Sequence, residues 1–146
     1  MPMSMKKRVG ALVCALGLLG ATTVWAQEVD VEELVLDNGM TVLLLPRPGD
    51  PNVSAGWVAK VGSVYERPGI TGVAHLFEHM MFKGSKNIDE EVHAQLINER
   101  GGRINAYTSR DVTVYHEDVT SESLPLVIDL EAERFLNLDI SASTLE

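Results

Sequence analysis

The sequence predicts an α+β fold in which a mainly antiparallel sheet carries its helices on one face. The predicted elements run as strands, two helices, strands and a last helix, so helices and strands do not alternate regularly as in a parallel α/β fold. Asn38-Gly39 lies between two apolar runs, which is the strongest short signal of an antiparallel hairpin. The chain has no internal repeat and no low-complexity segment.

The first half of the chain is expected to hold the hairpin, a further strand and a buried helix. The hairpin strands are Glu33–Leu36 and Met40–Leu45, and the alternation over Val53–Val61 predicts another strand. Gly62–Gly72 contains a proline and several glycines, so it is expected to be a loop. Gly72–Phe82 is apolar on nearly every side, which is typical of a buried helix.

The second half is expected to add two strands between two helices. Ile88–Arg100 has the pattern of a more polar helix, and the Gly101-Gly102 pair ends it. Strands are expected at Arg103–Thr108 and Val112–Glu117. A last helix is expected to begin at Ser121, with Ser123 as an alternative cap, to carry a proline in its first turn and to run to about Asn137.

The N-terminus has the three parts of a secretory signal peptide over residues 1–26. Lys6–Arg8 supplies positive charge, Val9–Val24 carries no charge, and Val24-Trp25-Ala26 offers the small residues that a signal peptidase reads. Cleavage is therefore expected between Ala26 and Gln27, leaving 27–146 as an exported chain in the bacterial periplasm or secreted. The alternative is a membrane anchor, but the apolar run is shorter than the roughly 20 residues that span a bilayer. We expect no stable membrane anchor.

Composition limits the class of protein. A chain of 146 residues allows one domain or a piece of one, and 45% hydrophobic against 23% charged residues is ordinary for a folded domain. Twenty-one acidic against 12 basic residues give a net charge of −9, which argues against a nucleic-acid partner. The single cysteine, Cys14, excludes a disulfide framework and a four-cysteine metal site.

The residues with the clearest chemical meaning are His75-Leu-Phe-Glu78-His79. On a helix, His75 and His79 lie one turn apart on the same face, so both imidazoles can bind one ion, and Glu78 can reach the same space. Zinc hydrolases need imidazole ligands, an open position for water and a carboxylate that accepts the proton of that water. The order His-x-x-Glu-His is the inverted zinc-peptidase signature.

The competing interpretation is that the three residues are ordinary members of the protein core. Burying one glutamate and two histidines on an otherwise apolar helix is costly unless these groups have partners. A metal ion would provide the partner. Chance alone would produce such a motif in roughly one in a hundred sequences of this composition, so the motif by itself is suggestive.

The neighbouring residues resemble the pitrilysin/insulinase family of zinc metallopeptidases, which includes the mitochondrial processing peptidase β subunit. His75–Ser85 is similar to the active-site helix of that family, and the similarity extends over 33–137. Further matching segments are Leu36–Met40, Gly62-Ser63, Glu66, Gly69–Ala74, Gly102, Asn105–Ser109, Thr113 and Tyr115. The resemblance implies the N-terminal part of a metallopeptidase domain.

The resemblance also implies roles for individual residues. His75 and His79 would bind a single Zn²⁺, and Glu78 would be the general base. Asn105 and Ala106 would lie on a strand that borders the cleft and pairs with extended substrate. The family's third zinc ligand is a glutamate on a later helix, and its expected position lies just past Glu146.

The last three glutamates and the other two histidines are not expected to bind the metal. Glu131 and Glu133 are interpreted as helix-surface residues or as partners of the ligands, and Glu146 as a solvated terminus. His93 and His116 are expected to have surface or structural roles.

Three functions follow from these residues. The first is a zinc endopeptidase that hydrolyses peptides or unfolded protein segments, with this chain as an inactive N-terminal fragment of a longer protein that has a further homologous domain or subunit. The second is a non-catalytic family member that binds peptides or supports an assembly, although such members typically lose the motif. The third is a metal-binding protein without hydrolysis, in which Glu78 would tolerate substitution.

Overall fold

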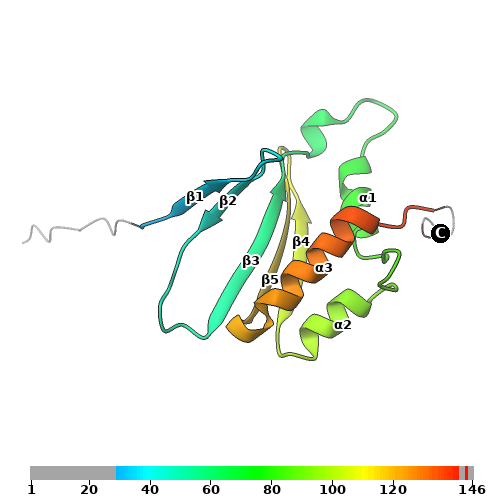
Figure 1. Cartoon of the computed structure of the whole chain (residues 1–146). Helices are drawn as coiled ribbons and strands as arrows, with labels where there is room; N and C mark the ends of the chain where they lie inside the picture. The colour runs from blue at the N-terminus through cyan, green and yellow to red at the C-terminus, as the bar shows by residue number, and fades with distance from the viewer. Residues whose placement is uncertain (1–28, 142–143, 145–146) are drawn as a thin grey trace, which may run out of the picture. The chain divides into compact units, whose positions relative to one another are not determined.

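The computed structural model describes residues 29–141 and residue 144 (Figure 1). The expected signal peptide, its cleavage site after Ala26 and the terminal Glu146 lie outside these residues. The chain forms two compact units, residues 1–47 and residues 48–146, and each is described separately.

In the described part of the first unit, β1 (Glu32–Val35) and β2 (Thr41–Leu44) form the predicted antiparallel hairpin. Gly39 has a φ of 84°, a left-handed conformation that glycine adopts without a Cβ clash. The Asn38 side chain accepts a hydrogen bond of 3.0 Å from the backbone N–H of Met40. The Asn-Gly pair therefore makes the turn that the sequence predicted.

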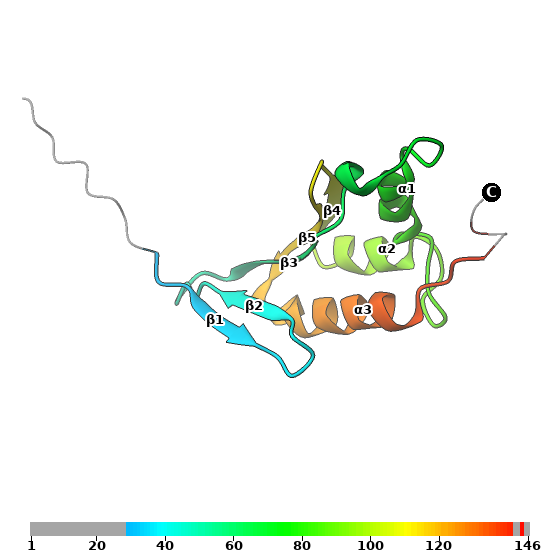
Figure 2. The ribbon, with the colours of Figure 1, turned by 90° about the horizontal axis from the view of Figure 1, so that it is seen from above.

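The second unit is built on an antiparallel sheet of β3 (Asn52–Ala59), β5 (Thr113–Thr120) and β4 (Arg103–Thr108), in that spatial order. The sheet carries α1 (Val73–Met80), α2 (Val92–Asn98) and α3 (Leu124–Asn137) on one face, as Figure 2 shows. Short 3₁₀ turns, η1 (Ser63–Tyr65) and η2 (Ser121–Ser123), precede α1 and α3. The predicted α+β class and the one-sided helix layer are confirmed.

The core of this unit lies between the sheet and helices α2 and α3. Ile97, Val119, Val127 and Leu130 are its buried members. Gly102 passes so close to β5 that a Cβ there would lie 2.9 Å from the carbonyl oxygen of Asp118. The glycine pair that ends α2 thus also lets the chain enter β4 in direct contact with the core.

Predicted boundaries of α3, β3, α2 and β5 were wrong. Helix α3 begins at Leu124 rather than Ser121, because Ser121–Ser123 form the 3₁₀ turn η2, and β3 ends at Ala59 rather than Val61. Helix α2 begins at Val92 rather than Ile88, because Ile88 belongs to a turn and Glu91 has a left-handed φ of 66°. In that turn the N–H of Ser85 donates a hydrogen bond of 2.7 Å to the carbonyl of Ile88. Strand β5 continues beyond Glu117 to Thr120, because its last residues pair with the start of β3.

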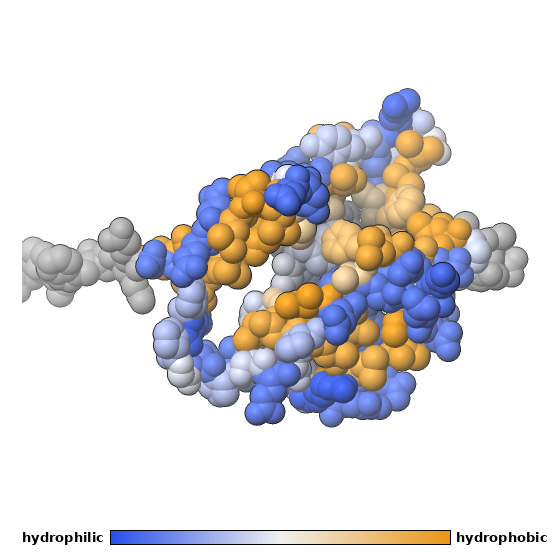
Figure 3. Space-filling view, in the orientation of Figure 1, coloured by the Kyte–Doolittle hydropathy of each residue, from blue (hydrophilic) through white to orange (hydrophobic). Residues whose placement is uncertain are grey.

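The expectation of a buried helix at Gly72–Phe82 also needs correction. Helix α1 is shorter, and Leu76 and Phe77 are 48% and 50% exposed. The buried side chains on α1 are Ala74, Glu78 and Met80. Exposed apolar side chains of the chain are visible as orange areas in Figure 3.

Candidate metal centre and active site

Helix α1 carries the histidine pair, and a carboxylate outside the helix fixes its first turn. Gly72 precedes the helix with a left-handed φ of 86°. The Glu66 carboxylate accepts backbone hydrogen bonds from Gly72 (2.7 Å) and Ala74 (3.0 Å), two of the amides that a helix start leaves without an intrahelical partner. These hydrogen bonds, that of Ala74 first, lower the pKa of Glu66. The loop before α1 is therefore tied to the helix that presents the motif.

His75 and His79 point at one another across one helical turn. Their Nε2 atoms lie 3.0 Å apart, their ring centroids are 4.6 Å apart, and both residues are exposed. Two Zn–N bonds of tetrahedral geometry place their nitrogens roughly 3.4 Å apart. The two nitrogens thus converge at nearly the separation that a shared zinc ion requires, so this pair fits two ligands of such an ion.

Glu78 lies on the same helix but faces the sheet. It is only 9% exposed, and its Oε2 atom accepts a short hydrogen bond from the hydroxyl of Thr108, at the end of β4. No imidazole hydrogen bond to Glu78 occurs within residues 29–141. The carboxylate is therefore positioned independently of the histidine pair, which suits a proton acceptor better than a third ligand.

An open hollow of about 700 Å³ lies beside these residues. Its lining includes His75 and Glu78 from α1, Ala106 and Thr108 from β4, and Arg110 from the turn after β4. Among the described strands, β4 pairs only with β5, so one edge of β4 remains available for backbone hydrogen bonds. A peptide in extended conformation is the kind of ligand that fits such an edge.

The two residues predicted to contact substrate both lie on β4. Ala106 lines the hollow, whereas Asn105 is exposed and accepts a hydrogen bond of 2.9 Å from the backbone N–H of Ala106. Their roles, like those of His75, Glu78 and His79, stay predictions.

The last two glutamates of the described chain are engaged elsewhere. Glu131 accepts hydrogen bonds from Trp57 (2.8 Å) and Arg134, and Glu133 accepts them from Ser85 (2.9 Å) and Asn87. The hydrogen bonds of Glu133, led by that of the Asn87 side chain, lower its pKa. Within the described residues, no carboxylate joins the histidine pair to make a group of at least three potential ligands. The expected third ligand therefore has no candidate in this part of the chain.

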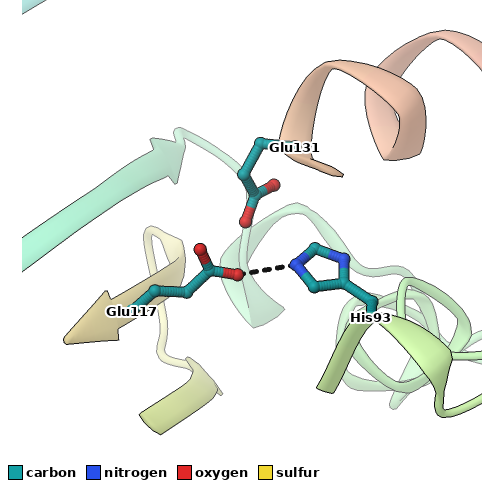
Figure 4. Close-up of side chains that lie close together, drawn as sticks. All are labelled: His93, Glu117 and Glu131. Atoms are coloured by element: carbon teal, nitrogen blue, oxygen red, sulfur yellow. Dashed lines mark hydrogen bonds and ion pairs between the residues drawn. The ribbon is translucent and has the colours of Figure 1, made fainter. Parts of the chain in front are cut away.

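A second group of ionisable side chains lies in the interior and was not expected. Figure 4 shows His93 of α2, Glu117 of β5 and Glu131 of α3 pointing toward one another, with ligand atoms within 4.8 Å. His93 and Glu117 are joined at 2.7 Å, and Glu117 is 1% exposed. His93 is thus buried and structural, one of the two roles expected for it. The sequence contained a signal, because Glu117 shares the inward face of β5 with Tyr115 and Val119.

This interior cluster fits a charge network better than a second metal site. Arg134 donates to both oxygens of Glu131, so a guanidinium already neutralises that carboxylate, and a cation beside it would be repelled. Arg134 is also held over the rings of Phe82 and Tyr115, at 5.2 and 5.0 Å from their centroids. Burial raises the pKa of the Tyr115 hydroxyl to about 12. The cluster therefore joins α2, α3 and the sheet beneath the helical layer.

Comparison with known proteins identifies the family of the chain. The family model of the insulinases (peptidase family M16) matches residues 41–146. The chain belongs to this family of peptidases.

Its described helices include none that is long and apolar enough to cross a membrane.

Individual relatives carry matching names. An uncharacterized zinc protease of Rickettsia bellii is 44% identical over 88 residues, which cover 60% of this chain and 21% of the relative. The insulin-degrading enzyme of Homo sapiens is 38% identical over 104 residues, which cover 70% of this chain and 10% of that enzyme. The chain thus spans only a small part of the length of these relatives.

Solved structures give the same picture. The structure of a protease from Helicobacter pylori superposes with a TM-score of 0.75 at 30% identity, covering 78% of this chain and 28% of that protein. Pitrilysin superposes with a TM-score of 0.72 at 30% identity, covering 78% of this chain and 12% of that protein.

Proposed function

We propose that the protein carrying this chain is a zinc-dependent endopeptidase that hydrolyses peptides or unfolded protein segments. The observation that carries the proposal is the arrangement on α1. Two imidazole nitrogens lie 3.0 Å apart on the same helix as the buried Glu78, and His75 and Glu78 line an open hollow. Membership of a peptidase family, with relatives named as zinc proteases, supports it.

In this mechanism His75 and His79 would hold Zn²⁺ through their imidazole nitrogens. Zinc in such a site polarises the scissile carbonyl and lowers the pKa of water. Glu78 accepts the proton of the attacking water and later delivers it to the leaving amine. The free edge of β4, at Asn105 and Ala106, holds the substrate through backbone hydrogen bonds, which give affinity without demanding one sequence.

The same proposal makes this chain inactive when isolated. The histidine pair supplies two protein ligands, whereas catalytic zinc sites usually have three. A glutamate beyond residue 146 and a further homologous domain or subunit would complete the site. From the sequence pattern over residues 1–26 we further propose that the protein is exported to the periplasm or the medium.

The test is Glu78→Gln in the parent protein, meaning the full reading frame that carries this chain. The substitution should keep zinc, because both imidazoles remain, and should lower hydrolysis of an unstructured peptide by roughly 10²–10⁴-fold, because an amide accepts no proton from water. The matched control is Glu99→Gln, at the exposed residue that directly follows α2. Full activity in Glu78→Gln would contradict the mechanism, and loss of zinc would make Glu78 a ligand instead.

A further inference from the structure

We propose that Thr108 is the positioning residue for Glu78: its hydroxyl holds one carboxylate oxygen so that the other faces the reacting water. This inference rests on the proposed peptidase function and adds a residue to it. Thr108 donates to Glu78 Oε2, whereas no donor within residues 29–141 reaches Glu78 Oε1. The two oxygens of the carboxylate are thus distinguished, and Oε1 is free to accept a proton.

Glu78 needs such a partner because of where it lies. Its side chain is on the sheet side of α1. The residue is 9% exposed and lies next to the buried Tyr115 and the partly buried Thr108. A buried carboxylate without a donor is costly and would rotate toward any available one. The Thr108 hydroxyl donates to Oε2 from a short side chain on a strand, so its position is more rigid than that of a donor on a long, flexible side chain.

Thr108 is in turn fixed by its neighbours. Thr113 stands directly opposite it on β5, and the two hydroxyl oxygens are 3.4 Å apart. Thr113 donates its own hydroxyl hydrogen to the carbonyl of Val61 at 3.0 Å. Because that hydrogen is used, Thr113 does not compete for Glu78, and the hydrogen of Thr108 is directed to the carboxylate, its nearer partner.

The loop before α1 is also attached to this strand pair. The backbone N–H groups of Ser63 and Val64 donate to the carbonyls of Ser109 and Arg110 at 3.2 and 2.9 Å. A Cβ on Gly62 would lie 2.5 Å from both of these carbonyl oxygens, so the close approach requires glycine. The end of β4 is therefore held at a fixed position relative to the segment that leads into α1. Thr108, at that end of β4, in turn fixes the position of the Glu78 carboxylate.

The experiment compares Thr108→Val, which has the same shape but no hydroxyl, with Thr108→Ser, which keeps the hydroxyl. In the parent protein, Thr108→Val should lower kcat for an unstructured peptide by roughly 10–100-fold through misplacement of the base, with little change in KM or in zinc content. Thr108→Ser should recover most of the activity. Thr41→Val, the same change at an exposed position on β2, is the control.

Two further measurements separate positioning from a structural role. In the Glu78→Gln background, Thr108→Val should lower kcat no further, because residues that act through one group are not additive. In this chain itself, without zinc, the carboxyl ¹³C resonance of Glu78 should move in Thr108→Val and stay in place in Thr108→Ser.

The outcomes distinguish this inference from the function on which it rests. A parent protein that binds zinc and cleaves no peptide contradicts the proposed function, and the positioning role falls with it. A parent that cleaves peptides while Thr108→Val keeps its kcat, or loses activity equally in the Glu78→Gln background, contradicts only the role of Thr108. An unmoved Glu78 resonance in Thr108→Val contradicts the hydrogen bond itself.

Discussion

At the residue scale, helix α1 buries a carboxylate while its large apolar neighbours stay half exposed. Glu78 is turned to the sheet by the Thr108 hydroxyl, whereas Leu76 and Phe77 have about half of their surface in contact with solvent. The facing of His75 and His79 was predictable, since residues four apart on a helix share a face. The partner of Glu78 was not predictable from periodicity, because Thr108 is thirty positions away and reaches it only through the fold.

The histidine pair gives the first prediction. His75→Ala or His79→Ala in the parent protein should abolish tight zinc binding and peptide hydrolysis together, because each substitution leaves one imidazole at the site. Zinc content by elemental analysis, measured on the samples used for the activity assay, checks this. The matched control is His116→Ala on β5, and retention of zinc in either α1 variant would show that the pair is not the metal site.

At the scale of elements, regular patterns were predictable and their ends less so. The Asn-Gly hairpin, the third strand and the glycines after α2 followed from local chemistry. The late start of α2 did not, because the Ser85–Ile88 turn and the hydrogen bond from the Lys86 N–H to the Asn137 carbonyl (2.9 Å) depend on where α3 lies. The extension of β5 likewise depends on its pairing with β3.

The contact of α2 with β5 gives the second prediction. His93→Ala should lower the free energy of unfolding of this chain by about 3–5 kcal/mol, because it leaves the buried Glu117 carboxylate without its hydrogen-bond partner. Urea unfolding followed by circular dichroism measures the change. Gln95→Ala, an exposed position on the same helix, should change it by about 0.5 kcal/mol or less.

A double-mutant cycle tests whether the two residues act as a pair. His93→Leu with Glu117→Leu should cost less than the sum of the two single changes, because no buried charge is left without a partner. Strictly additive effects would mean that His93 and Glu117 contribute independently, contrary to the 2.7 Å contact between them.

At the scale of the whole molecule, stability should depend on pH at both extremes, which is the third prediction. Glu66 and Glu133 have pKa values below the ordinary 4.5, so the folded chain binds fewer protons than the unfolded chain near that pH. Their contribution to the free energy of unfolding is present above pH 4.5 and is lost as the pH falls through their pKa values in the folded state. Tyr115 has its pKa raised from 10.0 to about 12, so its contribution is present below pH 10 and lost toward pH 12.

Thermal unfolding across the pH range measures these changes. Glu66→Gln with Glu133→Gln should flatten the acid side, and Tyr115→Phe should flatten the alkaline side. An acid limb that is unchanged in the double variant would assign acid sensitivity to other carboxylates.

Zinc affinity gives the fourth prediction, which concerns how much of the site this chain contains. The isolated chain should bind zinc weakly through its two imidazoles, and the parent protein should bind it tightly through a third ligand. A competition titration with a chelating dye compares the two proteins. Equal affinities would mean that a carboxylate within residues 1–146 completes the site, and Glu131→Gln and Glu133→Gln would then identify it.

The free edge of β4 has a consequence for the purified chain in solution. Natural proteins protect such edges with prolines, bulges or charged side chains. Strand β4 has no proline and no bulge, and its one charged residue is Arg103. An edge that accepts an extended peptide without reading its sequence also accepts the same edge of a neighbouring copy. At high protein concentration, chains should therefore pair edge to edge, and an added unstructured peptide should compete with this self-association and keep the chains apart.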